Sequence, residues 1–461
     1  MKNVKKNRKL YIILLVLIFL VSAVLIFAGY DYIQSGLIGS LIGSIRADQM
    51  YMIITLLILI PFLLLVLAIL LFFSGKRSSE NKKTMIVSSM ISGTNNEKKA
   101  DKGERFCMLS EIDRNSEKYK RTFYENGVTL ESFCQDFRNY AANKLKLYYD
   151  IEDIRRFVSG LAVSKLVILQ GMSGTGKTSL AHAFGSFTDN SSTVIPVQPM
   201  WKERTDLIGY YNEFTKRFNE TLLLEKMYEA NYSADMYITV LDEMNIARVE
   251  YYFAEFLSLL ELPNPDERFL DVVSDKWEND PKQFEGGRIK LPDNMWFIGT
   301  ANNDDSTFAI SDKVYDRAMI LNLDTKCERF IAPKTEKKPI SAEQFKALAE
   351  KAVKEYGVSK RNAQRLEEFD RYLIRHFHIT FGNRIMKQIR TYIPVYVACG
   401  GAELTALDDI LAKKVIRKLE TQNPIYLRNS AEELLSFIDE LFGTDKMPLC
   451  KEYIHRLQRN A

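Results

Sequence analysis

The central part of the chain alternates short apolar runs with longer stretches of helical period. The apolar runs have the composition of buried strands and lie at Leu166–Leu169, Thr193–Val197, Met236–Leu241, Trp296–Gly299 and Met319–Leu323. Helix-compatible segments separate them, notably Val249 to Leu260. Strands that alternate with helices are typical of a parallel sheet covered by helices. The pattern therefore predicts an α/β core over residues 161–330.

Helical periods dominate on both sides of this core. Within residues 105–160, apolar side chains recur at helical spacing, as Phe133, Phe137 and Tyr140 do. Residues 331–461 carry further helical periods, for example from Ala363 to Phe377 and from Arg384 to Ala398. We therefore expect a helical segment before the core, and a helical lid with additional C-terminal helices after it.

Two long apolar runs without charged residues, 10–29 and 50–73, stand near the N-terminus. Each is long enough to cross a hydrocarbon core of about 30 Å as a helix. The first run is longer than the apolar part of a cleaved signal peptide, which is the alternative interpretation. Basic residues flank the pair and are scarce between the two runs, which places both termini in the cytoplasm. The sequence thus predicts two transmembrane helices in residues 1–75, a flexible linker over 76–104, and a multi-pass protein of the cell membrane anchored in the lipid bilayer.

Composition adds little to this picture. The net charge of +4 is too small to indicate a partner, and the five cysteines contain no Cys-x-x-Cys pair. Scattered cysteines argue against a disulfide framework or a zinc site and fit a reducing compartment. The basic residues Lys413, Lys414, Arg417 and Lys418 can be interpreted as a nucleic-acid contact or as a solvated helix face, and the solvated face is the more common case.

The most informative motif is Gly-Met-Ser-Gly-Thr-Gly-Lys-Thr at residues 171–178, directly after the first apolar run and before a helix-compatible stretch. In such a loop, glycines let backbone N–H groups turn toward a polyphosphate, and the helix N-terminus adds partial positive charge. Lys177 is expected to reach the β- and γ-phosphates, and the Thr178 hydroxyl to coordinate Mg²⁺. The residues expected to bind nucleotide are Gly171, Met172, Ser173, Gly174, Thr175, Gly176, Lys177, Thr178 and Ser179.

Two further strand ends carry polar residues suited to nucleotide hydrolysis. The run Met236–Leu241 is followed by Asp242 and Glu243, and the run Trp296–Gly299 by Asn302. Asp242 is expected to hold Mg²⁺ and Glu243 to polarise the attacking water, which is the division of labour in ATP hydrolysis. Asn302 is expected to orient that water or to contact the γ-phosphate, with Asn303 as the second choice. An acidic turn and a turn asparagine are the alternative interpretations.

These motifs occur in the order that AAA+ ATPases use, with Asp316-Arg317-Ala318 as the fourth. Within that group, the stretch Leu241 to Phe253, together with Trp201 and Asp206 to Tyr211, resembles McrB-like proteins near the MoxR and dynein-related modules. The resemblance covers about residues 160–400. It implies an AAA+ core that binds ATP with Mg²⁺ and assembles as a homo-oligomeric ring, most commonly a hexamer. The segment from Ala301 to Asp305 departs from McrB, which prefers GTP, so the base preference of that protein does not carry over.

The resemblance also implies roles for residues outside the loop. Arg317 is similar to an arginine finger, which completes the site of a neighbouring subunit, and Arg384 to the second sensor arginine at the start of a lid helix. Residues 201–218 resemble an insertion in the second core helix, and residues 284–292 a hairpin before the sensor strand. Both elements typically face a central pore.

The function implied is a membrane-anchored AAA+ ATPase of McrB-like type that remodels or translocates a partner or nucleic acid. By analogy, it would serve anti-phage defence with a separately encoded nuclease or effector. The alternatives are a MoxR-like chaperone for membrane or surface proteins, and a nucleotide-switched binding module with little turnover. Gene neighbours would discriminate the first two, and phosphate release would exclude the third.

Overall fold

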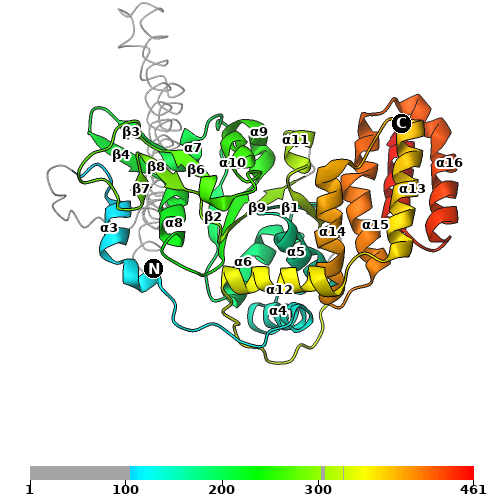
Figure 1. Ribbon diagram of the computed structural model, residues 1–461, viewed down its shortest axis with the longest axis horizontal. Helices are drawn as coiled ribbons and strands as arrows, with labels where there is room; N and C mark the ends of the chain where they lie inside the picture. Colours follow the sequence, from blue (N-terminus) through cyan, green and yellow to red (C-terminus); the bar gives the residue numbers. More distant parts are fainter. Residues whose placement is uncertain (1–103, 303–306, 325–326, 461) are drawn as a thin grey trace, which may run out of the picture. The chain divides into compact units, whose positions relative to one another are not determined.

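Five parallel strands form the central sheet of the computed structural model, which describes residues 104–302, 307–324 and 327–460 (Figure 1). The strand order is β10-β1-β9-β5-β2, and each adjacent pair is parallel. The strands are β1 (Leu166–Gln170), β2 (Thr193–Pro196), β5 (Tyr237–Asp242), β9 (Met295–Ala301) and β10 (Met319–Asn322). The α/β core with a parallel sheet is therefore confirmed, and each observed strand overlaps a predicted run.

Apart from the edge strand β2, the strands of this sheet are buried on both faces. Along β1, Val167 and Leu169 belong to one apolar cluster, whereas Leu166 and Ile168 belong to another, as expected when side chains alternate across a strand. The first cluster includes α4 (Leu130–Leu145), α5 (Ile151–Val163) and α6 (Lys177–Phe187). The second includes α8 (Leu222–Ala230), α9 (Val249–Tyr252) and α10 (Ala254–Leu259). Burial on both faces explains why the strands are continuous apolar runs.

Two small antiparallel sheets are inserted into the core. One is a hairpin of β3 (Gly209–Asn212) and β4 (Arg217–Glu220) that follows α7 (Thr205–Ile208). The other joins β6 (Phe269–Asp271), β8 (Arg288–Lys290) and β7 (Phe284–Glu285). The two hairpins coincide with the segments 201–218 and 284–292 singled out from the sequence. The remaining short elements are α3 (Met108–Arg114), η1 (Ser116–Tyr119), η2 (Met244–Ile246), η3 (Pro265–Glu267) and α11 (Asp312–Tyr315).

The C-terminal part is helical throughout its described residues. Its elements are α12 (Ala342–Glu355), α13 (Lys360–Phe377), α14 (Gly382–Ala398), α15 (Glu403–Lys414), η4 (Ile416–Thr421), α16 (Pro424–Phe442) and α17 (Pro448–Asn460). Helix α14 packs against α5, α12 and α15, so it joins the C-terminal helices to the core. The helices expected at 363–377 and 384–398 are present, each with an earlier start.

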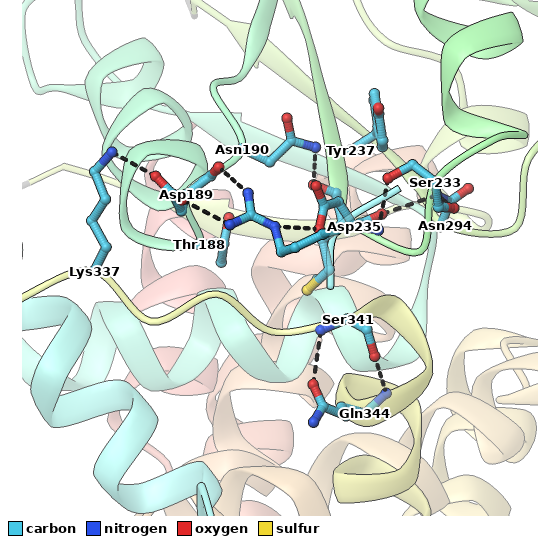
Figure 2. A network of polar contacts seen from close by, with 12 residues as sticks. Thr188, Asp189, Asn190, Ser233, Asp235, Tyr237, Asn294, Lys337, Ser341 and Gln344 are labelled. Atoms are coloured by element: carbon cyan, nitrogen blue, oxygen red, sulfur yellow. Dashed lines mark hydrogen bonds and ion pairs between the residues drawn. The ribbon is translucent and has the colours of Figure 1, made fainter. Parts of the chain in front are cut away.

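A polar network at the amino end of β5 fixes the connection between these two parts (Figure 2). Asp189, just after α6, pairs with Lys337 of the connecting segment (2.6 Å) and with Arg121 (2.8 Å). Arg121 also binds Asp235 (2.9 Å), whose backbone forms a bridge to Ser341 at the start of α12. The ammonium of Lys337, followed by Arg121, holds the pKa of Asp189 below its usual range. The N-terminal segment, the core and the C-terminal helices are thus joined by charged contacts at one place.

The expectation of a multi-pass membrane protein has to be corrected. Within residues 104–302, 307–324 and 327–460, no helix combines the length and the apolar character needed to cross a bilayer. Helices α13 and α16 have 18 and 19 residues, but both carry several charged side chains, which are costly inside a membrane. The runs 10–29 and 50–73 lie outside the described residues, as does almost all of the expected linker.

Candidate nucleotide site

The loop at residues 171–176 leaves the carboxyl end of β1 and leads into the first turn of α6. Gly176 is the N-cap of α6 with φ of 93°, and Gly171 and Gly174 also have positive φ values, of 144° and 83°. A Cβ atom on Gly171 would lie 2.4 Å from the carbonyl oxygen of Leu323, so only glycine fits there. The sequence therefore folds into a loop whose backbone N–H groups and helix N-terminus can face an anion.

Lys177 lies inside this loop. Its side chain is buried, and its Nζ donates to the carbonyl oxygens of Gly171 (2.9 Å) and Met172 (2.7 Å). These contacts hold the ammonium group within the curve of the loop. A polyphosphate held by the loop would therefore meet a cation that is already in position.

Asp242 and Thr178 meet at the carboxyl edge of the sheet, as the sequence predicted for a metal site. The Thr178 Oγ1 donates to Asp242 Oδ1 (2.7 Å), and the Thr300 Oγ1 donates to the same oxygen (2.8 Å). Hydroxyl and carboxylate oxygens are the ligands that Mg²⁺ prefers. Thr178 and Asp242 thus fit a magnesium ion, which would neutralise charge on the β- and γ-phosphate oxygens.

Thr300 is a residue that the sequence reasoning missed. It lies in β9, only 2% exposed, and its hydroxyl also accepts a hydrogen bond from the backbone N–H of Glu243 (2.8 Å). Glu243 is exposed and has a positive φ of 54°. One threonine hydroxyl therefore orients the Asp242 carboxylate and fixes the backbone of Glu243. The motif Gly299-Thr300-Ala301 contained this signal, but nothing in it distinguished the hydroxyl from a buried strand residue.

A cavity of about 250 Å³, which we call the phosphate cavity, connects these groups. Its lining consists of Ser173, Gly174, Gly176, Lys177, Thr178, Ser179, Asp242, Glu243, Thr300 and Asn302. Asn302 thus reaches the same cavity as the lysine and the two acids. Its backbone oxygen accepts from the Asn245 side-chain amide (2.9 Å), which fixes the end of β9. Asn303, the second choice for this role, lies outside the described residues.

A second cavity, of about 530 Å³, adjoins the outer side of the loop. Thr175 and Ser179 line it together with Leu147, Tyr149 and Arg329. The Tyr149 hydroxyl donates to the carbonyl oxygen of Gly176 (3.1 Å), and burial raises the pKa of this tyrosine. Its position beside the loop suits the base and ribose of a nucleotide. Tyr149 was not predicted, because it reaches the loop only through the packing of α4 and α5.

Arg317 and Arg384 lie at the opposite edge of the sheet from the loop. The Ser164 hydroxyl, just before β1, donates to the carbonyl oxygen of Arg317 (2.8 Å), whereas the loop follows β1. A five-residue strand spans roughly 17 Å at about 3.3 Å per residue. The structure therefore brings neither arginine to the loop of its own chain.

The two arginines share one carboxylate. Glu261, just after α10, accepts from the Arg317 guanidinium at 2.5 Å and also pairs with Arg384 at the start of α14. Arg317 donates in addition to the carbonyl oxygen of Lys313 (2.7 Å). Glu261 had no signal in the sequence, because the fold alone places it between these two residues.

The C-terminal helices hold the segment that carries Arg317. Gln388 of α14 donates to the carbonyl oxygen of Asp316 (3.1 Å), and Lys414 of α15 donates to the carbonyl oxygens of Tyr315 (2.6 Å) and Ala318. Burial lowers the pKa of Lys414 to about 7. Lys413, Lys414 and Arg417 are all buried, so the expected solvated helix face is wrong for them, and they are also withdrawn from any nucleic-acid contact.

The chain resembles two known families and several solved structures. Residues 166–318 match the family described as AAA domain (dynein-related subfamily), and residues 334–461 match a domain of unknown function (DUF8727). No curated protein matches the chain. A solved structure of a "putative ATPase" from Cytophaga hutchinsonii is similar, with a TM-score of 0.44 and 13% identity, covering 71% of this chain and 97% of that one. An MCM homolog from Methanopyrus kandleri has a TM-score of 0.35 and 10% identity, covering 63% of this chain and 61% of that one.

The fold, the loop and the family match define an ATP-hydrolysing P-loop enzyme. More narrowly, residues 166–318 match the AAA domain of the dynein-related subfamily, which supports an AAA+ ATPase.

Proposed function

We propose that this enzyme works as an oligomeric motor of the McrB-like type, in which each ATP site is completed by Arg317 and Arg384 of a neighbouring subunit. The supporting observation is that both arginines bind Glu261 at the edge of the sheet opposite to the phosphate cavity. A guanidinium that cannot reach the nucleotide of its own subunit can contribute to hydrolysis only at the nucleotide of another subunit. Supplied there, it offsets the charge that develops on the transferring phosphoryl group.

Within one subunit, the remaining roles follow from the contacts of the phosphate cavity. Lys177 and the loop backbone bind the β- and γ-phosphates, and Thr178 and Asp242 hold Mg²⁺. Glu243 accepts a proton from the attacking water, which Asn302 orients. Thr300 is a positioning residue, since it contacts Asp242 and Glu243 and acts through them.

In the proposed ring, the free energy of ATP hydrolysis drives mechanical work on a partner. The hairpins β3–β4 and β7–β8 are exposed additions to the AAA+ core, and in the proposed ring they contact the substrate. By analogy with McrB-like proteins, that substrate is a nucleic acid or a separately encoded nuclease or effector of a defence system. Turnover that rises when DNA or RNA is added would support a nucleic-acid substrate, whereas unchanged turnover would leave a protein partner.

Steady-state phosphate release by the full chain tests the composite site. Because two subunits form each site, the specific activity should rise with protein concentration and then level off. Arg317→Ala should lower kcat by roughly a thousandfold, the scale of an arginine finger, with little change in nucleotide affinity. Lys313→Ala, an exposed residue of α11 just before Arg317, is the matched control and should retain activity. A specific activity that is independent of concentration, with Arg317→Ala fully active, would refute the proposal.

A further inference from the structure

A third cavity, of about 680 Å³, lies between the sheet and the C-terminal helices, and we call it the interdomain cavity. On the sheet side it is lined by Gln170 and Asn322, at the carboxyl ends of β1 and β10. On the other side its lining comes from α15, η4, α16 and α17. It shares a single lining residue, Asn302, with the phosphate cavity. Its volume is in the range of small-molecule sites, which is about 300–1,000 Å³.

The wall of the interdomain cavity contains polar groups with unmet hydrogen-bonding capacity. Among the described residues, Asn245 Oδ1, Asn322 Oδ1 and Arg417 Nε are buried without a hydrogen-bond partner. Asn245 and Arg417 are 4% and 9% exposed, so water does not simply solvate their side chains. Most proteins keep few such groups. The residues that carry these atoms line the cavity, so part of its wall is polar.

Basic residues outnumber acidic ones in the lining of the cavity. Lys413, Arg417 and Arg456 line the cavity, against Glu420 as the one carboxylate in its wall. The Arg417 guanidinium lies 4.1 Å from the centre of the Tyr315 ring, and that of Arg456 lies 4.2 Å from the Tyr453 ring. An arginine that lies over an aromatic ring has one face covered, while its N–H groups at the edge remain able to bind phosphate oxygens.

Arg456 is the member of this set best placed to bind a ligand. Lys413 pairs with Asp409 (2.5 Å) and Arg417 with Asp312 (2.5 Å), whereas Arg456 pairs with no carboxylate among the described residues. Its side chain is exposed at the cavity, and the amides of Gln170, Asn322 and Gln422 offer donors and acceptors further inside. A phosphate at Arg456 would thus place the rest of a small molecule among amides and aromatic rings.

We propose that the interdomain cavity binds a small phosphorylated ligand of nucleotide size, with Arg456 as the phosphate partner and the amide side chains contacting its polar ring. This site is separate from the ATP site and lies largely within residues that belong to the domain of unknown function and the strand ends facing it. Binding at the cavity does not depend on the proposed motor function.

The position of the cavity couples such a ligand to hydrolysis. Asn245 lies two residues after Glu243. Its side-chain amide donates to the backbone oxygen of Asn302 (2.9 Å), and its backbone oxygen accepts from the Phe308 N–H (2.8 Å). Asn245, Asn302 and Phe308 all line the interdomain cavity. A ligand that contacts them would have different affinities for the ATP and ADP states, and by reciprocity it would change the ATP cycle. This coupling rests on the proposed role of Asn302.

Nucleoside monophosphates are suitable probes, because a P-loop reads the β- and γ-phosphates that they lack. We would titrate AMP, GMP, CMP and UMP separately into the full chain by calorimetry, with the ATP site saturated by a non-hydrolysable ATP analogue and Mg²⁺. At least one should bind with Kd below about 1 mM, equivalent to about 4 kcal/mol. Arg456→Gln should weaken this binding at least tenfold. Arg459→Gln, an exposed arginine of the same helix outside the cavity lining, should leave it unchanged.

The outcomes separate the site from its coupling to hydrolysis. No binding by any of the four probes, or binding that Arg456→Gln leaves intact, would overturn the proposed site, whatever the ATPase activity is. Affinity that is lost in Arg456→Gln but retained in Arg459→Gln would support it. The same titration with ADP in the P-loop should give an affinity that differs at least threefold, and identical affinities would refute the coupling alone.

Discussion

Replacement of Thr300 by valine tests how the phosphate cavity is organised. Valine keeps the shape of the side chain and its preference for a strand, but removes the hydroxyl. The structure assigns that hydroxyl two hydrogen bonds, to Asp242 Oδ1 and from the Glu243 N–H, both of 2.8 Å. Thr300→Ser retains the hydroxyl and serves as the matched control. The Thr300 side chain is buried, so water cannot readily replace the lost contacts.

The size of the effect follows from these two contacts. A hydrogen bond to a charged group contributes about 1.5–3 kcal/mol, and an unsatisfied buried N–H costs about 1–3 kcal/mol. If about 2–3 kcal/mol of this is lost from the transition state, kcat falls by about 30- to 150-fold, at 1.36 kcal/mol for each factor of ten. Nucleotide affinity should change much less, since the Thr300 hydroxyl bonds to Asp242 and Glu243 and not to the backbone of the loop.

The assay is steady-state phosphate release by the full chain, with nucleotide affinity measured by titration of a fluorescent ATP analogue. Thr300→Val should show the kcat defect with an almost unchanged Kd, and Thr300→Ser should keep kcat within about threefold of the wild type, a difference of less than about 1 kcal/mol. If Thr300→Val keeps wild-type turnover, the hydroxyl does not position Asp242 and Glu243. If both variants lose activity equally, a packing defect explains the loss instead.

Three further predictions concern the loop and the contacts that hold the domains. Gly171→Ala should abolish nucleotide binding in the fluorescence titration, because its Cβ would lie 2.4 Å from the Leu323 oxygen, whereas Gly357→Ala, with open space around it, should bind normally. Asp189→Asn should lower the free energy of unfolding measured in urea at pH 7. Because the pKa of Asp189 is lowered in the folded state, the difference in this free energy between the wild type and the variant should shrink as the pH falls below about 4. A difference that stays constant down to pH 2 would contradict the charge pairing. The pKa of Lys414 is lowered to about 7 in the folded protein, so the unfolded chain binds more protons between pH 7 and about 10. The free energy of unfolding should therefore rise with pH over that range, and Lys414→Met should remove this rise. An unchanged pH profile in Lys414→Met would show that the buried amine is not its source.

Local signals explain why the sequence alone predicted the strands of the central sheet, the phosphate-binding loop and the polar residues at the strand ends. The apolar runs are long enough and sufficiently separated to identify the strands, and the glycines and Lys177 lie in one continuous motif. Because the carboxyl ends of parallel strands share an edge, Asp242 and Asn302 could be expected near Thr178. The structure places all three around one cavity.

The remaining features depend on packing between distant segments. Tyr149, between α4 and α5, reaches the loop because α4 packs against both α5 and α6. Glu261 pairs with Arg317 and Arg384, which are far from it in the sequence. Lys413 and Lys414 follow an amphipathic pattern that a solvated helix face would also show. Only the contact of α15 with the Tyr315–Ala318 segment distinguishes the two cases. No single-sequence pattern contains that information.

The central claim is that one subunit supplies the nucleotide and its neighbour supplies Arg317. Its most direct test is steady-state ATP hydrolysis by mixtures of two inactive full-length variants, Arg317→Ala and Glu243→Gln. In a mixed ring, an Arg317→Ala subunit keeps Glu243 and can receive Arg317 from a Glu243→Gln neighbour. The account predicts that activity absent from each variant alone returns on mixing and peaks near equal proportions. Mixtures that stay inactive at every ratio, although the two variants assemble together, would contradict it.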